Sequence, residues 1–291
     1  MASSTPASNS AKVWLITGCS SGIGRQLAIA ARKRGDLVIA TARKVETLDD
    51  LKKLGCEALA LDISASADAV KQVIDKAHAF YGRIDILVNN AGDTTIGAIE
   101  EANDQETLTL FDTNVFGHLR VTRAVLPHMR EKRSGIIANI GSAAGYFATP
   151  VNSLYGAAKF ALAGVTQSLA SEVAHLGIEV TLIEPGMFKT RDMTRLNVFE
   201  QSIADYDPVK KAVQEQLAAG FGIPPQNPAK GAQAIVEALT KTGHCAGRAL
   251  PRRMPLGGEL RPLLEAELAA RTKELNAWAI FTHPEAFAFD P

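Results

Sequence analysis

The segment V-W-L-I-T-G-C-S-S-G-I-G, residues 13–24, decides the fold. Its apolar start predicts a buried strand over 13–17, and the helical period that follows predicts a helix over 22–34. Between them Gly18, Gly22 and Gly24 fall in the spacing G-x-x-x-G-x-G. Such glycines let the phosphates of a nucleotide approach the backbone and the free N–H groups of a helix N-terminus. An ordinary turn could use the same residues, but their position between strand and helix favours phosphate binding.

The rest of the chain repeats this alternation of short apolar runs and longer segments of helical period. Strands are predicted at 37–41, 57–61, 84–89, 135–140 and 178–183, and helices at 46–54, 65–81, 104–131 and 153–175. A helix near 228–241, a short strand around 247–250 and a helix near 259–277 follow. This order predicts an α/β fold with a parallel sheet covered by helices on both faces. No linker or repeat interrupts it, so we expect residues 12–291 to form one domain.

Three segments depart from this regularity. Residues 186–227 form a long irregular stretch, and because such stretches are commonly functional we expect a substrate lid here. Residues 258–291 form a C-terminal extension whose aromatic residues predict packing, a wall of the pocket or a subunit interface. Residues 1–11 are mostly small and polar, which predicts a disordered tail.

The composition argues against several classes of protein. Among 291 residues, 31 basic side chains balance 31 acidic ones, so no nucleic-acid partner is expected. No apolar run reaches the roughly 20 residues of a membrane span. The three cysteines and six histidines lack the spacing of a metal site, so no metal is expected. An odd number of cysteines without a secretory leader indicates reduced thiols and predicts a cytoplasmic location.

Residues at the ends of the next strands fit a dinucleotide. Many dinucleotide folds carry an acidic residue on the ribose hydroxyls, whereas this chain has Arg43 in that region. A guanidinium can bind the 2′-phosphate that a carboxylate would repel, so Arg43 predicts NADP(H); a solvated basic residue is the alternative. Asp62 can accept a hydrogen bond from the adenine amino group. Asn90 and Gly92 can lie beside the ribose and nicotinamide, and Asn89 fits that role and a structural one equally well.

A second group of polar residues predicts proton transfer. Tyr155 and Lys159 lie one helical turn apart in a helix that is otherwise mostly small and apolar. The ordinary pKa of a phenol is near 10, and we expect the neighbouring ammonium of Lys159 to lower it. A carbonyl held between Ser142 and Tyr155 would be polarised for hydride attack, with Asn114 holding a water that links Lys159 to solvent. A packed tyrosine and a snorkelling lysine are the alternative, which the occurrence of all these signals in one chain disfavours.

Together these motifs resemble the short-chain dehydrogenases/reductases. The resemblance is close over residues 12–190 and looser to 258, and it rests on T-G-C-S-S-G-I-G (17–24), N-N-A-G (89–92), Asn114, Ser142, Y-G-A-A-K (155–159) and P-G-M-F-K-T (185–190). It implies a doubly wound, Rossmann-type parallel sheet of seven strands, and homo-oligomers, dimers or tetramers, joined through the helices over 104–131 and 153–175. The strand end A-T-A-R-K (40–44) looks like the NADP-preferring branch.

The resemblance also implies roles for single residues. Asn114, Ser142, Tyr155 and Lys159 would form the catalytic tetrad, with Tyr155 as general acid/base. Further cofactor contacts are expected from Ser20, Ser21, Ile23, Tyr155, Lys159, Pro185, Gly186, Phe188 and Thr190. Asp93 departs from the family pattern, in which a small or apolar residue frequently follows N-N-A-G.

Apolar residues near this site predict the substrate. The expected pocket residues are Tyr146, Phe147, Val151, Met187 and Phe199. They indicate a small hydrophobic ketone or aldehyde, reduced with hydride from NADPH and a proton from Tyr155. The alternatives are NADP-dependent oxidation of a secondary alcohol of the hydroxysteroid or retinol type, and a binding protein that keeps the fold without catalysis. Lyase or isomerase chemistry at the same site is a further alternative.

Overall fold

The computed structural model of the protein describes residues 11–190, 197–219, 224–283 and 286–287. Seven parallel strands form the main sheet in the order β3-β2-β1-β4-β6-β7-β9, which confirms the predicted sheet. Their bounds are β1 Val13–Ile16, β2 Leu37–Ala42, β3 Glu57–Ala60, β4 Ile86–Asn89, β6 Gly135–Ile140, β7 Ile178–Pro185 and β9 Arg253–Leu256. Two short strands, β5 Thr95–Ile96 and β8 Asn197–Val198, form a separate parallel pair. The predicted tail lies outside the described residues except for Ala11.

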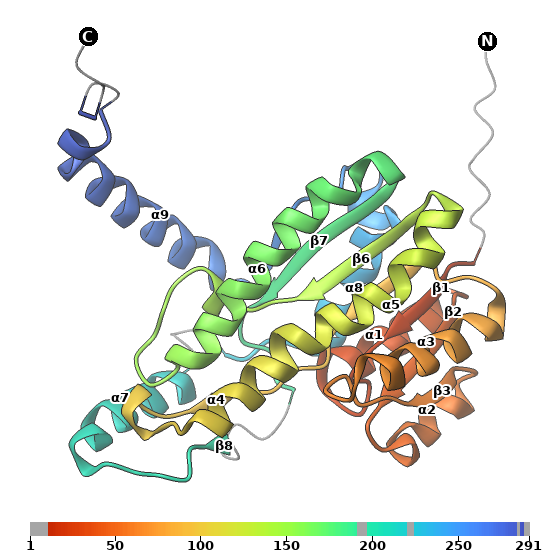
Figure 1. Ribbon diagram of the computed structural model, residues 1–291, viewed down its shortest axis with the longest axis horizontal. Coiled ribbons are helices and arrows are strands. Elements are labelled where there is room, and N and C mark those ends of the chain that lie inside the picture. The colour runs from red at the N-terminus through yellow and green to blue at the C-terminus, as the bar shows by residue number, and fades with distance from the viewer. Residues whose placement is uncertain (1–10, 191–196, 220–223, 284–285, 288–291) are drawn as a thin grey trace.

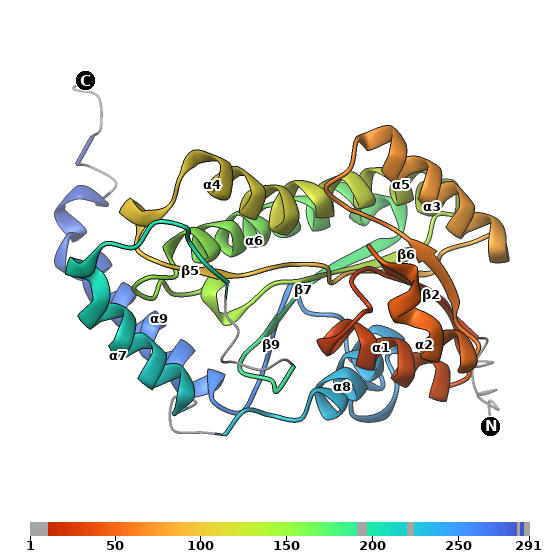
Figure 2. The same cartoon turned by 90° about the horizontal axis from the view of Figure 1, so that it is seen from below.

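Helices cover both faces of the sheet (Figures 1 and 2). One layer contains α1 Gly22–Lys33, α2 Asp49–Lys53 and α8 Pro228–Thr240, and the other contains α3 Ala67–Tyr81, α5 Gly117–Lys132 and α6 Ser153–Val173. The strands read as continuous apolar runs because successive side chains enter cores on opposite faces. Trp14 and Ile16 belong to the core under α1 and α8, whereas Val13 and Leu15 belong to the core under α3 and α5.

The order of the strands creates a crevice at the centre of the sheet. β1 lies between β2 and β4, so the chain leaves β1 in one direction and later returns on its other side. In a parallel sheet the loops at the carboxyl ends of two such strands run apart, and ligands bind between them. The glycine turn follows β1 and the N-N-A-G segment follows β4, so both lie at this point.

The structure differs from the predicted elements at three places. The seventh strand is β9, Arg253–Leu256, and not residues 247–250. The irregular stretch 186–227 contains a helix, α7 Asp207–Ala218. The long helix predicted over 104–131 consists of α4 Asp104–Phe111 and α5, joined by a π-helical turn over Asp112–Phe116. Single π-turns inside helices occur frequently at functional sites, and this one carries Asn114.

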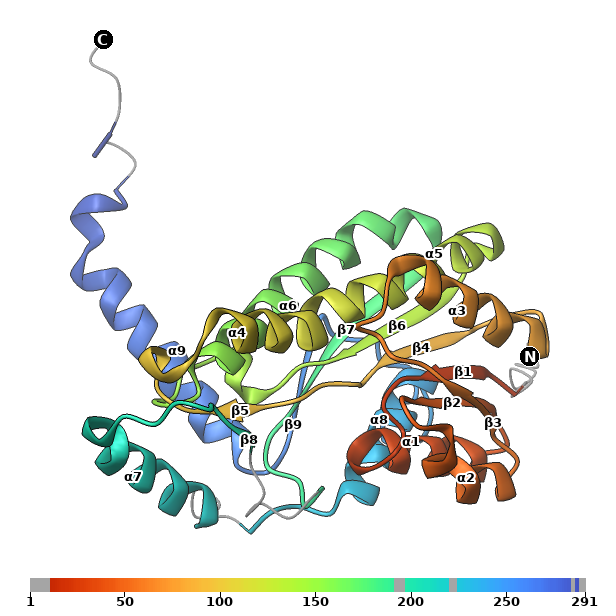
Figure 3. The same cartoon turned by 60° about the horizontal axis from the view of Figure 1, so that its bottom comes forward.

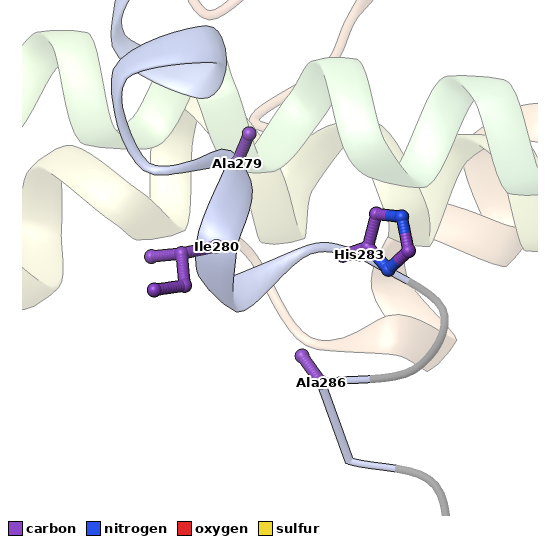
Figure 4. Close-up of a pocket in the computed structure, with 4 residues that line it drawn as sticks. All are labelled: Ala279, Ile280, His283 and Ala286. Carbon is purple, nitrogen blue, oxygen red and sulfur yellow. The ribbon is translucent and has the colours of Figure 1, made fainter.

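The C-terminal helix α9, Leu260–Ala277, extends away from the sheet (Figures 1 and 3). Its first turns are anchored, since Leu260 and Leu264 are buried, but Leu268, Leu275 and Trp278 are exposed. A shallow hollow at the far end is lined by Ala279, Ile280, His283 and Ala286 (Figure 4). None of the helices in the described part of the chain is long and apolar enough to cross a membrane. The assignment of the whole chain to one domain stays a prediction.

Candidate active site

A cavity of about 610 Å³ opens where β1, β4, β6 and β7 end. It brings together residues from widely separated stretches of the sequence. Most of the predicted site residues line it: Gly18, Ser20, Ser21, Gly22, Ile23, Arg43, Asp62, Asn90, Gly92, Asn114, Ser142, Tyr155, Lys159, Pro185, Gly186 and Thr190. The predicted phosphate-binding turn and the predicted catalytic residues therefore share one cavity.

The glycine turn after β1 has space that side chains would fill. Gly18 has a φ of +72°, and a Cβ there would lie 2.7 Å from the Cα of Ala91. A Cβ on Gly24, just behind the cavity lining, would collide with the amide group of Asn90. That amide donates hydrogen bonds to the backbone oxygens of Thr17 and Gly18 at 2.9 and 3.1 Å. The turn leads into α1, which has no acidic residue in its first turn, so this cradle fits the phosphates of a dinucleotide.

Asn89 and Asn90 are neighbours with different environments. Asn90 lines the cavity, whereas Asn89 is fully buried and does not. The side-chain amide of Asn89 donates to Oγ1 of Thr122 and to Oδ1 of Asn139, both at 2.9 Å. These bonds tie β4 to α5 and β6. Of the two roles that the sequence left open for Asn89, cofactor contact and structural support, they favour structural support.

The ends of β2 and β3 supply the charged residues at the other end of the cavity. Arg43 follows β2 directly, and its exposed side chain lines the cavity. Asp62 lies in the turn after β3, where its Oδ1 accepts a hydrogen bond from the backbone N–H of Ser64 at 2.9 Å. A cation and a carboxylate thus line the same cavity, and their contacts with a ribose phosphate and an adenine stay a prediction.

Lys159 is buried with an exposed fraction of 4%. Its Nζ donates to the backbone oxygen of Ile140 at 3.1 Å and lies 5.5 Å from the centre of the Tyr155 ring. Because burial penalises the charged form, it lowers the pKa of Lys159 from 10.5 to about 8. The two side chains therefore lie close together, but the ammonium is itself destabilised by its surroundings.

The pKa of Tyr155 differs from the expectation. Burial raises it above the ordinary value, the hydrogen bond with Ser142 lowers it, and the negative charge of Asp93 raises it further. Desolvation of the phenolate is the largest of these effects, so the predicted lowering by Lys159 is wrong for the protein without cofactor. Tyr155 is therefore protonated at neutral pH.

Asn114 is held by the π-helical turn. Its amide group donates to the backbone oxygens of Asp93 and Leu110 at 2.8 and 2.9 Å. Its buried Oδ1 has no hydrogen-bond partner among the described residues. A Cβ on Gly92 would lie 3.0 Å from this oxygen and 3.7 Å from Nζ of Lys159. Gly92 thus leaves space beside an acceptor that remains available for a water or a ligand.

Several residues of the cavity have no counterpart among the predicted site residues. Asp93, Thr94 and Thr95 follow β4, and Asn197 and Val198 form β8; Gln105, Glu106 and Thr109 come from α4. His118, buried behind the cavity, lies with its Nε2 2.6 Å from the backbone oxygen of Ala91, and burial lowers its pKa to about 3. The only sequence signal for any of them was the unusual Asp93.

The residues predicted to wall the substrate pocket do not line this cavity. They are Tyr146, Phe147, Val151, Met187 and Phe199, and Phe188, a predicted cofactor contact, is also absent from the lining. The ring of Phe188 packs against Gly231, where a Cβ would lie 2.6 Å from it, and Phe199 packs in the same way beside Gly97. Aromatic side chains are buried against the backbone of other segments because this removes their large apolar surface from water.

The sequence matches the family described as short chain dehydrogenase (adh_short) over residues 12–201. The chain is similar to Oxidoreductase BOA17 of Botryotinia fuckeliana, with 36% identity over 78% of this chain and 84% of that protein. Among solved structures it is similar to a short-chain dehydrogenase from Streptomyces avermitilis, with a TM-score of 0.84 and 40% identity over 96% of this chain and 99% of that one.

Two further solved structures contain a nicotinamide cofactor. A 3-ketoacyl-(acyl-carrier-protein) reductase from Brucella melitensis in complex with NADH has a TM-score of 0.72 and 25% identity, over 87% of this chain and 99% of that one. An actinorhodin polyketide ketoreductase with NADPH has a TM-score of 0.72 and 29% identity, over 88% and 99%. The family match covers more than half of the chain and agrees with the sheet and the cavity. The chain therefore belongs to the short-chain dehydrogenase family of oxidoreductases.

Proposed function

We propose that the protein is an NADPH-dependent carbonyl reductase. The observation that carries this proposal is the shared cavity: the glycine turn, Arg43, Ser142, Tyr155 and Lys159 all line it. Two structurally similar proteins are named a 3-ketoacyl-(acyl-carrier-protein) reductase, in complex with NADH, and a polyketide ketoreductase, with NADPH, and they support the same reaction class here. The same residues would also catalyse the reverse oxidation, because proton and hydride transfer are reversible.

The side chains of this cavity divide the work of a reduction. The bound cofactor supplies a hydride to the carbonyl carbon. Ser142 donates a hydrogen bond to the carbonyl oxygen, and Tyr155, whose phenol is protonated at neutral pH, donates the proton. Lys159 would hold the nicotinamide ribose, and a water at the unpartnered Oδ1 of Asn114 would let it return a proton to the tyrosine. Because Arg43 favours NADP(H), a cofactor pool that most cells keep reduced, we propose reduction as the main direction.

Arg43 supports NADPH over NADH. The guanidinium follows β2 directly, where it can bind the phosphate on the adenosine ribose through paired hydrogen bonds. The related structures contain either cofactor, so the preference in this chain rests on Arg43 itself. A carboxylate at the same position would repel the phosphate and accept hydrogen bonds from the ribose hydroxyls of NADH.

We also propose that the protein forms a homo-oligomer in the cytoplasm. The helices that the family resemblance assigns to subunit contact leave Leu108, Phe116 and Phe160 exposed. These apolar side chains support an interface there. The described cysteines are free thiols, which agrees with a reducing compartment.

The test is a comparison of cofactors with a panel of neutral ketones. Wild-type protein should oxidise NADPH with at least one ketone and prefer it to NADH. Arg43→Asp should lower the NADPH/NADH ratio of kcat/KM by roughly 10- to 100-fold, because charge-assisted hydrogen bonds are lost and a repulsion is added. Lys33→Asp is the control. It makes the same change of charge at the C-terminal end of α1, away from the cavity, and should leave the NADPH/NADH ratio of kcat/KM unchanged. Cofactor binding without turnover of any carbonyl would instead favour a binding protein.

A further inference from the structure

The substrate end of the cavity is lined mostly by polar side chains, whereas the sequence analysis expects apolar ones. Beyond the residues assigned to the cofactor and to catalysis, its lining includes the apolar Leu110 and Val198 and the polar Asp93, Thr94, Thr95, Gln105, Glu106, Thr109, Thr113 and Asn197. Within the described lining, Arg43 and Lys159 are the basic side chains. Arg43 lies at the end of β2, and Lys159 is buried with its Nζ bonded to the backbone oxygen of Ile140.

The two carboxylates at this end differ in what occupies their oxygens. Both oxygens of Glu106 accept backbone N–H groups, from Glu200 at 2.9 Å and from Asn103 at 3.0 Å. Asp93 uses only Oδ1, which accepts from the backbone N–H of Thr94 and the amide of Asn197, both at 2.9 Å. Its Oδ2 has no hydrogen-bond partner in the part of the chain that the structure describes. Asp93 therefore offers a half-buried anionic acceptor to a ligand.

The backbone holds Asp93 beside the catalytic residues. Its carbonyl oxygen accepts the amide of Asn114 at 2.8 Å, and Gly92, which precedes it, approaches the same asparagine. The charge of Asp93 raises the pKa of Tyr155, so its field reaches the phenol that would contact the substrate. In a partly desolvated cavity, a fixed negative charge at this range acts on any charged group of the substrate.

We propose that Asp93 is a specificity-determining residue that selects carbonyl compounds bearing an ammonium or hydrogen-bond donor group near the keto group and disfavours keto acids. The inference rests on the proposed function, since it concerns the substrate of the same cavity. Discrimination arises from attraction of one charge and repulsion of the other. The expected substrates are therefore not hydrophobic carbonyl compounds in general, but those with a hydrogen-bond donor at one end.

A purely structural role is the competing explanation, because Asp93 also ties β8 to the loop after β4. The two roles are separated by two variants. Asp93→Asn keeps an oxygen acceptor for Thr94 and Asn197 and removes the charge, whereas Asn197→Ala removes the tie and keeps the charge. Charge selection predicts that the first variant changes the substrate preference and the second does not.

The experiment uses three ketones on one scaffold, with a neutral, an ammonium or a carboxylate group at the same position. The kcat/KM of each charged ketone with NADPH is divided by that of the neutral one for the same variant. Wild type should prefer the ammonium to the carboxylate compound by at least tenfold, and Asp93→Asn should reduce this preference about tenfold. Asn197→Ala should retain it within about twofold.

The Kd values of the matching ammonium and carboxylate alcohols for the NADPH-bound protein give the same comparison without turnover. These Kd values test charge selection even if the protein reduces no ketone. An absence of ketone reduction would count against the proposed function and not against charge selection. Equal charge preference in wild type and Asp93→Asn would overturn the inference.

Discussion

The sheet body, residues 11–190 and 224–264, and the C-terminal arm, residues 265–283, differ in how far their apolar side chains are buried. In the body Trp14 and Leu27 are fully buried, and glycines stand where backbones approach closely. In the arm Leu275 and Trp278 are 58% and 63% exposed. Burial in the body fixes the cavity, so small changes there should have large effects. The arm contributes little to the packing of the described chain, so similar changes in it should have small ones.

The largest effect is expected where the body carries out the chemistry. Tyr155→Phe removes the proposed proton donor and keeps the ring, so kcat should fall about 1000-fold, equivalent to ~4 kcal/mol. The affinity for NADPH should change little, because the phosphate cradle is untouched. Steady-state kinetics and a fluorescence titration with NADPH measure the two quantities. Tyr81→Phe, which removes a phenol at the end of α3, is the control and should retain wild-type kcat. Near-normal turnover in Tyr155→Phe would exclude this residue as the acid.

The next effect tests the tight packing of the glycine turn. Gly24→Ala places a methyl group against the amide of Asn90 and the backbone oxygen of Gly18. The clash and the lost hydrogen bonds should cost roughly 2–4 kcal/mol of unfolding free energy and weaken NADPH binding. Urea unfolding and cofactor titration measure these losses.

The matched control is Gly164→Ala in α6, where the added methyl group meets open space. Because alanine favours the helix over glycine, this variant should gain ~0.5–1 kcal/mol. If Gly24→Ala gained stability as Gly164→Ala should, the close approach of the backbone at Gly24 would not be the reason for the glycine.

The third effect is the dependence of stability on pH that a buried amine produces. Since the pKa of Lys159 is about 8 in the folded protein and 10.5 in the unfolded chain, the unfolded state binds more protons between these values. The penalty of burying Lys159 is therefore fully present below pH 8 and is relieved as the pH rises to 10.5. Relative to Lys159→Met, wild type should gain on the order of 3 kcal/mol across this window.

Urea unfolding of both proteins at pH 7, 8, 9 and 10 measures this difference and cancels the titration of other groups. A difference that stays constant with pH would show that Lys159 keeps its ordinary pKa. In that case the amine is better solvated than its buried position indicates.

The difference between buried and exposed segments also explains which elements could be predicted from the sequence. β1, α1 and β2 were predicted to within one residue, because strands buried on both faces read as apolar runs. β9 was misplaced, because R-M-P-L is no apolar run: it is the edge strand of the sheet and half-buried, where Arg253 and Pro255 are tolerated. Helix α7 was missed because its apolar residues, such as Val209 and Val213, form only a narrow stripe.

The residues of the candidate site could be predicted from the sequence, but their environment could not. Ser142, Tyr155 and Lys159 could be predicted from spacing and family resemblance, and they line one cavity. The environment that sets their pKa values could not be predicted, because desolvation depends on segments distant in sequence. For the same reason Phe199, in the segment 186–227, was expected in the pocket, although its ring is buried against the backbone of Gly97.

The smallest effect should be found in the arm. Leu275→Ala in α9 removes a side chain that is mostly exposed and replaces it with a residue of similar or better helix propensity, so stability should change by less than ~0.5 kcal/mol. Leu27→Ala, the same substitution in the buried face of α1, should cost about 2–5 kcal/mol because it leaves a cavity. Urea unfolding at low protein concentration compares the two. A loss above ~1 kcal/mol for Leu275→Ala that grows with protein concentration would show that a second copy covers the arm, since only association makes stability depend on concentration.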